Sequence, residues 1–340
     1  MSGSKRVVVR TDQPLPPLSW RDEVREVPHV WPQLARVWLA ATRDAVHGWT
    51  PWHTLAERGR GEWALLPGFV LADPEPPGTD LGSWRLPESA FPLLVLGSPL
   101  GRCSDVAYSF WTPKLYESMV HAVVTDAATA GVRGVLAPWI PDRQGSDALA
   151  HAMADNGAHT VPGGRLTRAT PPDLPPNIPV DADVTTFDAS TVGEVLPQVC
   201  ELIAARTATA AGPEAVGRLL GRLAEAGADL CGAITVHNGT PAAVGVAVRK
   251  AHHLFVPFVA ATDRDERDVC LRAILDDQLG RTDSRALRSI ELGSSIDDSA
   301  VLPNARPREL TTALLVLDAS ARPQAYADLD ESAEPTPAAT

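Results

Sequence analysis

The sequence predicts an α/β protein built from two modules, each a mixed sheet flanked by helices. The chain has 340 residues, which is about twice the length of an ordinary domain. Apolar runs of strand length alternate along it with longer amphipathic runs of helix length. A proline-rich stretch, 170–181, separates a half that holds all nine tryptophans from a half that holds none. We therefore expect modules at 1–169 and 182–318, joined by a stiff linker at 170–181.

The first module opens with a helix, because apolar residues between Trp31 and Ala45 recur at helical spacing and Pro32 suits a first turn. The stretch 63–71 reads as a strand interrupted near Pro67 and Gly68, and 92–96 as a buried strand. A long loop leads to a helix at 113–130, then a strand at 132–140 and a helix at 147–156. A glycine follows each of these two helices, as is common after a helix C-terminus.

The second module shows a clearer pattern. Helices are expected at 191–206 and 213–226, followed by strands at 229–237 and 242–249. The Asn238-Gly239 pair between these strands is a strong hairpin signal. The pattern then predicts a strand at 254–261, a helix at 265–279, and strands at 289–292 and 311–317. Residues 319–340 are acidic and poor in large apolar residues, so a disordered tail is expected.

Composition narrows the functional classes. With 30 basic and 42 acidic residues the net charge is -12, which argues against a broad nucleic-acid-binding face but leaves room for a local basic cleft, and no DNA partner is expected. No apolar stretch has the length of a membrane span, and the N-terminus does not read as a secretory signal. The four cysteines are far apart, which predicts reduced thiols in a cytoplasmic protein. No histidine, cysteine or acid pattern predicts a metal site.

The element order of the second half, α-α-β-β-β-α-β-β, resembles the GNAT acyltransferase fold. The whole chain resembles a tandem version, the Fem-type and peptidoglycan-biosynthesis-like aminoacyltransferases of actinobacteria. The resemblance rests on 92–99, 113–140, the hairpin at Asn238-Gly239, 254–279, and 290–295 leading to 304–306. It implies an enzyme that forms an amide bond by attack of an amine on an activated acyl group. The donor would be an aminoacyl-tRNA, with an acyl-CoA as the alternative, and no cofactor would be needed.

The expected diphosphate-binding turn of a CoA-dependent GNAT enzyme is missing. Such enzymes carry a glycine-rich turn before a helix, where backbone N–H groups hold the diphosphate. The corresponding stretch, 260–267, has no glycine and contains Asp263, Asp265 and Glu266, which we interpret as a helix cap. This favours aminoacyl-tRNA as the donor, which then needs a local basic track, expected from the arginines in 264–288 and 1–60.

The loop at 97–114 is a candidate substrate-binding segment. It is longer than most connections without regular structure, and it follows a buried strand at the edge where α/β ligand sites open. The alternative is a surface loop with a solvated Lys114. The candidate binding residues here are Gly97, Ser98, Arg102, Trp111 and Lys114.

Catalytic candidates follow from the need to remove a proton from the amine. Glu291, Asp297 and His253 are the candidate bases, and backbone N–H groups where strand 254–261 separates from strand 289–292 are candidates for holding the oxyanion. Ser294, Ser295 and Arg306 are further candidates for substrate binding. For each of these residues, the alternative is a charged or polar group solvated at a strand end.

The lysine that the resembling family carries after Gly293 is absent, as is its basic segment between modules. These departures favour a small amine acceptor, as in antibiotic and other specialised-metabolite biosynthesis, over a peptidoglycan precursor. Three functions thus stay open: an aminoacyl-tRNA-dependent transferase, an acyl-CoA N-acyltransferase, and a catalytically silent binding module.

Overall fold

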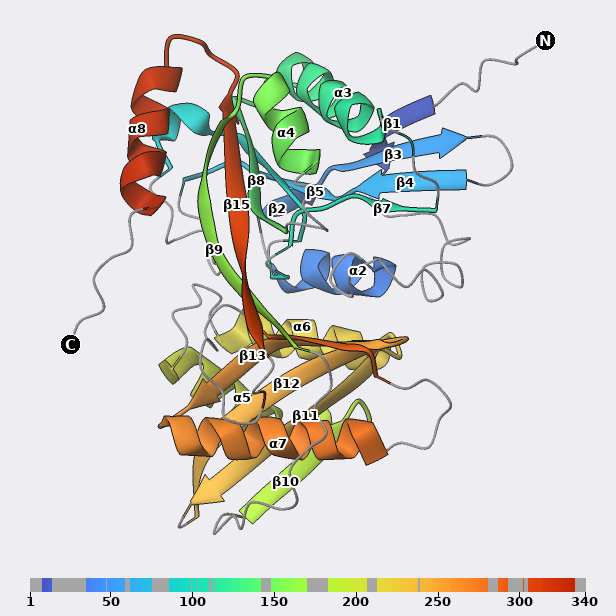
Figure 1. Cartoon of the computed structure of the whole chain (residues 1–340), viewed down its shortest axis with the longest axis vertical. Helices are drawn as coiled ribbons and strands as arrows, with labels where there is room; N and C mark the ends of the chain where they lie inside the picture. The colour runs from blue at the N-terminus through green and yellow to red at the C-terminus, as the bar shows by residue number, and fades with distance from the viewer. Residues whose placement is uncertain are drawn as a thin grey trace. The chain divides into compact units, whose positions relative to one another are not determined.

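A computed structural model of the chain describes residues 8–13, 35–46, 48–58, 62–74, 86–98, 100–101, 103–109, 112, 114–141, 148–169, 183–206, 213–237, 239–280, 287–292, 302 and 305–333. Contacts between Cα atoms divide the chain into two compact units (Figure 1). Unit 1 comprises 1–39, 46–164 and 309–340, and unit 2 comprises 40–45 and 165–308. The expected linker at 170–181 lies outside the described residues.

Unit 1 is a mixed α/β structure. A small sheet has the strand order β1-β3-β4-β7, and a second run of strands has the order β2-β5-β6-β8-β15. Strands β6 and β8 are parallel, whereas the pairs β1–β3, β3–β4, β4–β7, β2–β5, β5–β6 and β8–β15 are antiparallel. The elements are β1 (Val8–Gln13), α2 (Arg36–Ala45), β2 (Trp49–Pro51), β3 (His53–Arg58), β4 (Glu62–Leu66), β5 (Gly68–Leu71), β6 (Leu93–Leu96), β7 (Ala107–Tyr108), α3 (Leu115–Thr129), β8 (Gly134–Pro141), α4 (Ala148–Asp155), β9 (His159–Ala169), β15 (Arg306–Val316) and α8 (Arg322–Ala333).

The last helix corrects the expectation of a disordered tail. Residues 322–333 form α8, and Ala325 and Leu329 are completely buried. The helix is held to unit 1 by the Tyr326 hydroxyl, which donates to the Gly157 carbonyl at 2.9 Å, and by His159, which lies 2.7 Å from Asp330. The prediction of disorder was wrong here because two apolar side chains at helical spacing, one of them a leucine, are enough to dock a short helix.

Unit 2 contains one mixed sheet with helices on both faces. Its strand order is β10-β11-β12-β13-β14-β9, with β13 and β14 parallel and the others antiparallel. Helix α7 packs against one face, and α5 and α6 pack on the other (Figure 1). The elements are β10 (Asp183–Asp188), α5 (Val192–Arg206), α6 (Pro213–Glu225), β11 (Asp229–His237), β12 (Thr240–Lys250), β13 (His253–Ala261), α7 (Arg264–Gly280) and β14 (Ser289–Leu292), with β9 completing the sheet.

The face covered by α7 is apolar and closely packed. Even-numbered residues of β13 and β14 (Leu254, Val256, Ile290, Leu292) form one core cluster with Cys270 and its neighbours on α7. Gly245 in β12 lets the helix approach, because a Cβ there would lie 2.7 Å from the end of the Ile274 side chain. Side chains alternate between the faces of a strand, so the odd-numbered residues of β14, and those of β13 up to Val256, point to the face that carries α5.

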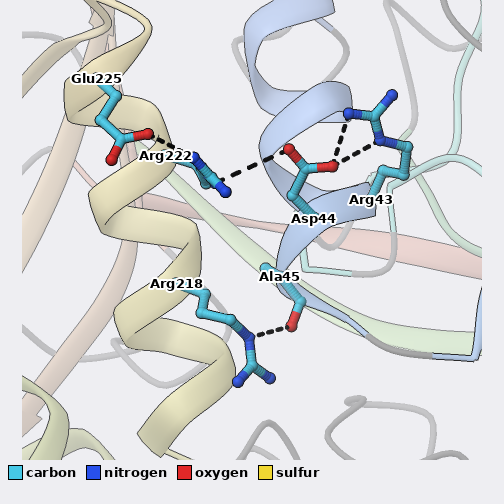
Figure 2. Close-up of polar contacts among 6 residues, drawn as sticks. All are labelled: Arg43, Asp44, Ala45, Arg218, Arg222 and Glu225. Atoms are coloured by element: carbon cyan, nitrogen blue, oxygen red, sulfur yellow. Dashed lines mark hydrogen bonds and ion pairs between the residues drawn. The ribbon is translucent and has the colours of Figure 1, made fainter.

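The end of α2 belongs to unit 2, where it lies beside α6 (Figure 2). Arg218 of α6 donates a hydrogen bond through Nε to the carbonyl of Ala45. This carbonyl lies at the C-terminus of α2, where carbonyl groups have no partner within the helix. Arg222 lies 3.8 Å from Asp44 and 2.7 Å from Glu225. These contacts fix the C-terminus of α2 against α6.

The main elements expected from sequence are present, but the contact units differ from contiguous modules. Gly131, Gly157 and Gly227 all have positive φ angles just after helices, and Gly239 has one in the predicted hairpin. Residues 309–318, expected in the second module, belong to unit 1 because β15 pairs with β8. Strands β9 and β10 were not expected from the sequence.

Candidate active site

The parallel pair in unit 2 ends in the middle of β13. Strands β13 and β14 are in register from His253 and Ser289 to Val256 and Leu292. Beyond Val256, β13 continues for five residues to Ala261, while the described part of β14 ends at Leu292. From Pro257 to Ala261, the edge of β13 on the β14 side therefore has no strand partner among the described residues. In α/β sheets, this carboxyl end of parallel strands is where ligands bind.

A β-bulge sits at the same point. Phe258 pairs with Val246 and Phe255 with Val248, so two residues of β13, Val256 and Pro257, oppose a single residue of β12. Pro257 has no N–H to offer. Thr262 donates to the Ala242 carbonyl of β12, and the alternation of an antiparallel ladder then turns the N–H groups of Val259 and Ala261 away from β12. These two N–H groups face the edge that β14 no longer covers.

Polar side chains gather on the sheet face opposite α7. His253, Ser289 and Glu291 are odd-numbered residues of β13 and β14, whose even-numbered neighbours face α7. Arg168 of β9 lies directly opposite Glu291 in the antiparallel register, and Lys250 of β12 lies opposite His253, so both share this face. Such a row is unusual in a sheet interior, because buried ionisable groups are costly unless they are paired.

Glu291 is the acid of this row, and its side chain is buried. Its side chain is 4% exposed, and its Oε1 lies 3.9 Å from Nε of Arg168, whose side chain is 35% exposed. The residue stands one position before Leu292, where the parallel pairing ends. A carboxylate at this position is the type of group that can accept a proton from a substrate held at the strand end.

His253 lies at the other end of the parallel pair. Its Nδ1 is 2.5 Å from the hydroxyl oxygen of Ser289, which is buried. Val256 follows it by three positions along the extended strand, a distance of roughly 10 Å. Glu291 is therefore better placed than His253 to act at the point where β13 and β14 separate.

The N-terminus of α7 is capped by the side chain of Asp263, the residue just before the helix. The Oδ1 atom of Asp263 accepts the backbone N–H of Glu266 at 2.9 Å. The Glu266 carboxylate in turn accepts the hydroxyl of Thr235 at 2.8 Å and lies 3.8 Å from Nδ1 of His237. The predicted cap is confirmed, and one N–H that would otherwise be available to a phosphate is already bonded.

Helix α7 does not carry a free basic track. Arg272 makes two contacts with the Asp276 carboxylate, at 3.0 and 2.9 Å, and Arg267 lies 3.4 Å from Asp268. Five acids accompany the three arginines of this helix. The basic track expected within 264–288 is therefore not provided by α7.

Unit 1 also contains a pair of parallel strands, β6 and β8. The space beyond the end of their pairing is occupied by Ser104 of the same chain. Strands β6 and β8 are in register up to Val95 and Leu136. Beyond that point Ser104 lies between them: its hydroxyl donates to the Leu96 carbonyl at 2.7 Å and contacts the Pro138 carbonyl, and its N–H donates to the Trp139 carbonyl. Ser104 is buried.

Gly97 and Ser98, predicted to bind substrate, lie in this filled region. A Cβ on Gly97 would be 2.3 Å from the carbonyl oxygen of Cys103, and φ there is +91°. Ser98 is buried and accepts a hydrogen bond from Nε1 of Trp38 at 2.8 Å. These contacts give both residues a packing role, and their part in binding stays a prediction. Lys114 is exposed at the start of α3.

The other predicted site residues divide into two groups. Arg306 is exposed at the start of β15. Arg102, Trp111, Ser294, Ser295 and Asp297 lie outside the described residues. Of the predicted catalytic residues, the structure thus brings Glu291 and His253 to one sheet face.

Arg168, Ser289 and Lys250 were not predicted. A signal for Ser289 was present, because Ser289 and Glu291 alternate with Ile290 and Leu292 in a short strand that is buried throughout. Arg168 had no such signal, because its strand was not recognised and its partner is more than a hundred positions away in sequence.

Among the described residues there is no group of three or more potential metal ligands. Within the same residues, no helix is both long enough and apolar enough to cross a membrane.

No protein-family model matches the sequence, and no curated protein matches it either. Solved structures do match the fold. A tandem GNAT protein from the clavulanic acid biosynthesis pathway aligns with a TM-score of 0.53 at 14% identity, covering 83% of this chain and 88% of that one. FemX aligns with a TM-score of 0.55 at 9% identity, covering 89% of this chain and 96% of FemX. At these identities the likeness concerns the fold: the chain has the tandem GNAT fold, as its sequence led us to expect.

Proposed function

We propose that this protein is an amide-bond-forming acyltransferase that moves an aminoacyl group from aminoacyl-tRNA to the amine of a small molecule. The reaction would take place in unit 2, where the parallel pair ends. The observation that carries the proposal is the buried Glu291 carboxylate, one residue before that end, on a fold shared with a tandem GNAT protein and FemX.

The chemistry follows from the groups that meet there. The acceptor reacts as its neutral amine: the nitrogen attacks the acyl carbonyl carbon, and Glu291 takes the proton that this nitrogen loses. The N–H groups of Val259 and Ala261 stand at the open edge, where they can donate to the oxyanion that forms. The ester C–O bond breaks, the amide forms, and the departing ribose hydroxyl of the tRNA takes up the proton from Glu291.

Unit 2 is preferred over unit 1 because the corresponding place in unit 1 is taken by Ser104. A donor there would have to displace a buried residue with three hydrogen-bond contacts. In unit 2, the edge of β13 beyond Val256 has no strand partner among the described residues.

The acidic N-terminus of α7 favours an acyl donor that does not need a diphosphate-binding site there. Asp263 already takes the N–H of Glu266, and the adjoining Asp265 adds a second negative charge. Both disfavour an anion at this helix N-terminus. An aminoacyl ester of tRNA needs no such grip, although its phosphates would have to be held by parts of the chain other than α7.

A direct test uses the purified full chain with a panel of amines. One arm supplies charged tRNA mixtures with labelled amino acids, and the other supplies acetyl-CoA. RNase-sensitive formation of an amide product supports the proposal. Consumption of the thioester with product formed in the second arm alone would replace it with the acyl-CoA alternative. No product in either arm would leave a binding module and would refute catalysis.

A further inference from the structure

Arg168 forms an ion pair with the candidate base that is too long for a hydrogen bond. Its Nε lies 3.9 Å from Oε1 of Glu291, and this is the one ion pair that its side chain makes with the described residues. The Arg168 side chain is 35% exposed, while that of Glu291 is 4% exposed. The guanidinium therefore reaches from the buried carboxylate toward solvent.

A guanidinium group can serve two carboxylates at once. It has five N–H donors in a planar fork, and two of them match the spacing of carboxylate oxygens. With Nε directed to Glu291, the two terminal nitrogens remain for a second anion. Lys250, which is buried on the same sheet face, adds another positive charge to the row. An anion that enters beside Glu291 would therefore meet the terminal nitrogens of Arg168.

We infer that Arg168 binds a carboxylate of the acceptor, so that the acceptor is an amino-acid-like amine that carries both an amine and a carboxylate. The carboxylate pairs with the terminal nitrogens of Arg168, and the amine lies toward Glu291. The two ends of the substrate thus meet opposite charges on neighbouring strands. This inference rests on the proposed function for the role of Glu291, but the carboxylate requirement can be measured without any transfer.

The first experiment needs no variant. Isothermal titration calorimetry of the full chain compares amino acids with their primary amides, which keep the amine and lose the negative charge. We expect the free acids to bind about 10- to 100-fold more tightly, the range for a charge-assisted hydrogen bond. Where transfer is observed, rates are compared per unprotonated amine, because an α-carboxamide makes the amine less basic. Equal binding of acid and amide would overturn the inference.

Variants then test whether Arg168 is the group responsible. In R168Q the preference for the acid over the amide should disappear, and in R168K it should be partly retained, because lysine keeps the charge but loses the fork. R222Q, which breaks an exposed ion pair on α6, is the control and should keep the full preference. If R168Q weakens acid and amide equally, Arg168 only supports Glu291 and the inference fails.

The two proposals fail in different ways. Product formation without any difference between acid and amide would refute the carboxylate site and leave the transferase standing. Acid-selective binding that R168Q abolishes, with no product from any donor, would keep the site and refute the transferase. Thermal unfolding of each variant by circular dichroism confirms that the comparison is made on folded protein.

Discussion

The cap at the start of α7 gives a test of the donor that can be worked out from the structure. Asp263 accepts a hydrogen bond from the N–H of Glu266 at 2.9 Å. Asp265 lies in the first turn of the helix and contributes a negative charge there. D263A removes both a cap and a charge, and D265N removes a charge alone. Losing the cap costs about 1 kcal/mol and losing the charge about 0.5 kcal/mol. D263A should therefore destabilise by about 1.5 kcal/mol, or roughly 3–6 °C in Tm.

The same variants report on phosphate binding. Removing one negative charge from a helix N-terminus should strengthen binding of a nearby anion by about 2- to 5-fold. Calorimetry with coenzyme A should accordingly show weak binding to the natural chain and somewhat tighter binding to D263A and D265N. Scanning calorimetry measures the stability change in parallel. Tight binding of coenzyme A that D263A weakens, or an unchanged Tm in D263A, would refute the reasoning about this turn.

Three further predictions concern activity, packing and pH. E291Q should lower kcat/KM for transfer by about 10²- to 10⁴-fold, the usual contribution of a general base, with Tm nearly unchanged; full activity would remove this residue from the mechanism. G97A should lower the free energy of unfolding of unit 1 by about 3 kcal/mol or more, because the new methyl would meet the backbone oxygen of Cys103 at 2.3 Å and φ is +91°. Urea unfolding measures this free energy, and a loss under about 1 kcal/mol would contradict the packing described for Gly97. The side-chain and backbone hydrogen bonds from Ser190 hold the pKa of Asp188 below its ordinary value. Its contribution to stability is thus present above the unfolded pKa and is lost as pH falls through the folded pKa, which carboxyl NMR should show, with S190A moving the pKa upward.

Much of the fold was readable from local patterns. The helix ends at Gly131, Gly157 and Gly227 and the turn at Gly239 were predictable, because each needs a positive φ that glycine adopts at little cost. Asp263 was recognisable as a cap from residue type and position. Such features depend on neighbours within a few residues.

Strands β9 and β10 escaped prediction. The first four residues of β10 are exposed, so no apolar alternation marks it. Strand β9 contains Pro162, Gly163 and Gly164, which usually signal a turn. Helix α8 looked like a solvated tail because its docking depends on only a few apolar side chains, Ala325 and Leu329 among them. In each case pairing or packing with a distant element outweighed the local preference.

The candidate site shows the same division. Glu291 could be selected from sequence as an acid in a strand that follows the last long helix of unit 2. Its role as the better placed base, compared with His253, depends on the register of β13 and β14, which decides how far each residue lies from the end of the pairing.

The sequence by itself determined the two-module α/β class, most helix ends and the acidic cap of α7, because each arises from chain neighbours or from the period of apolar residues. Tertiary structure alone decided that Arg168 stands opposite Glu291 and that Ser104 fills the open end of β6 and β8. Strand register and loop packing join residues that are remote along the chain, and no local pattern encodes that pairing.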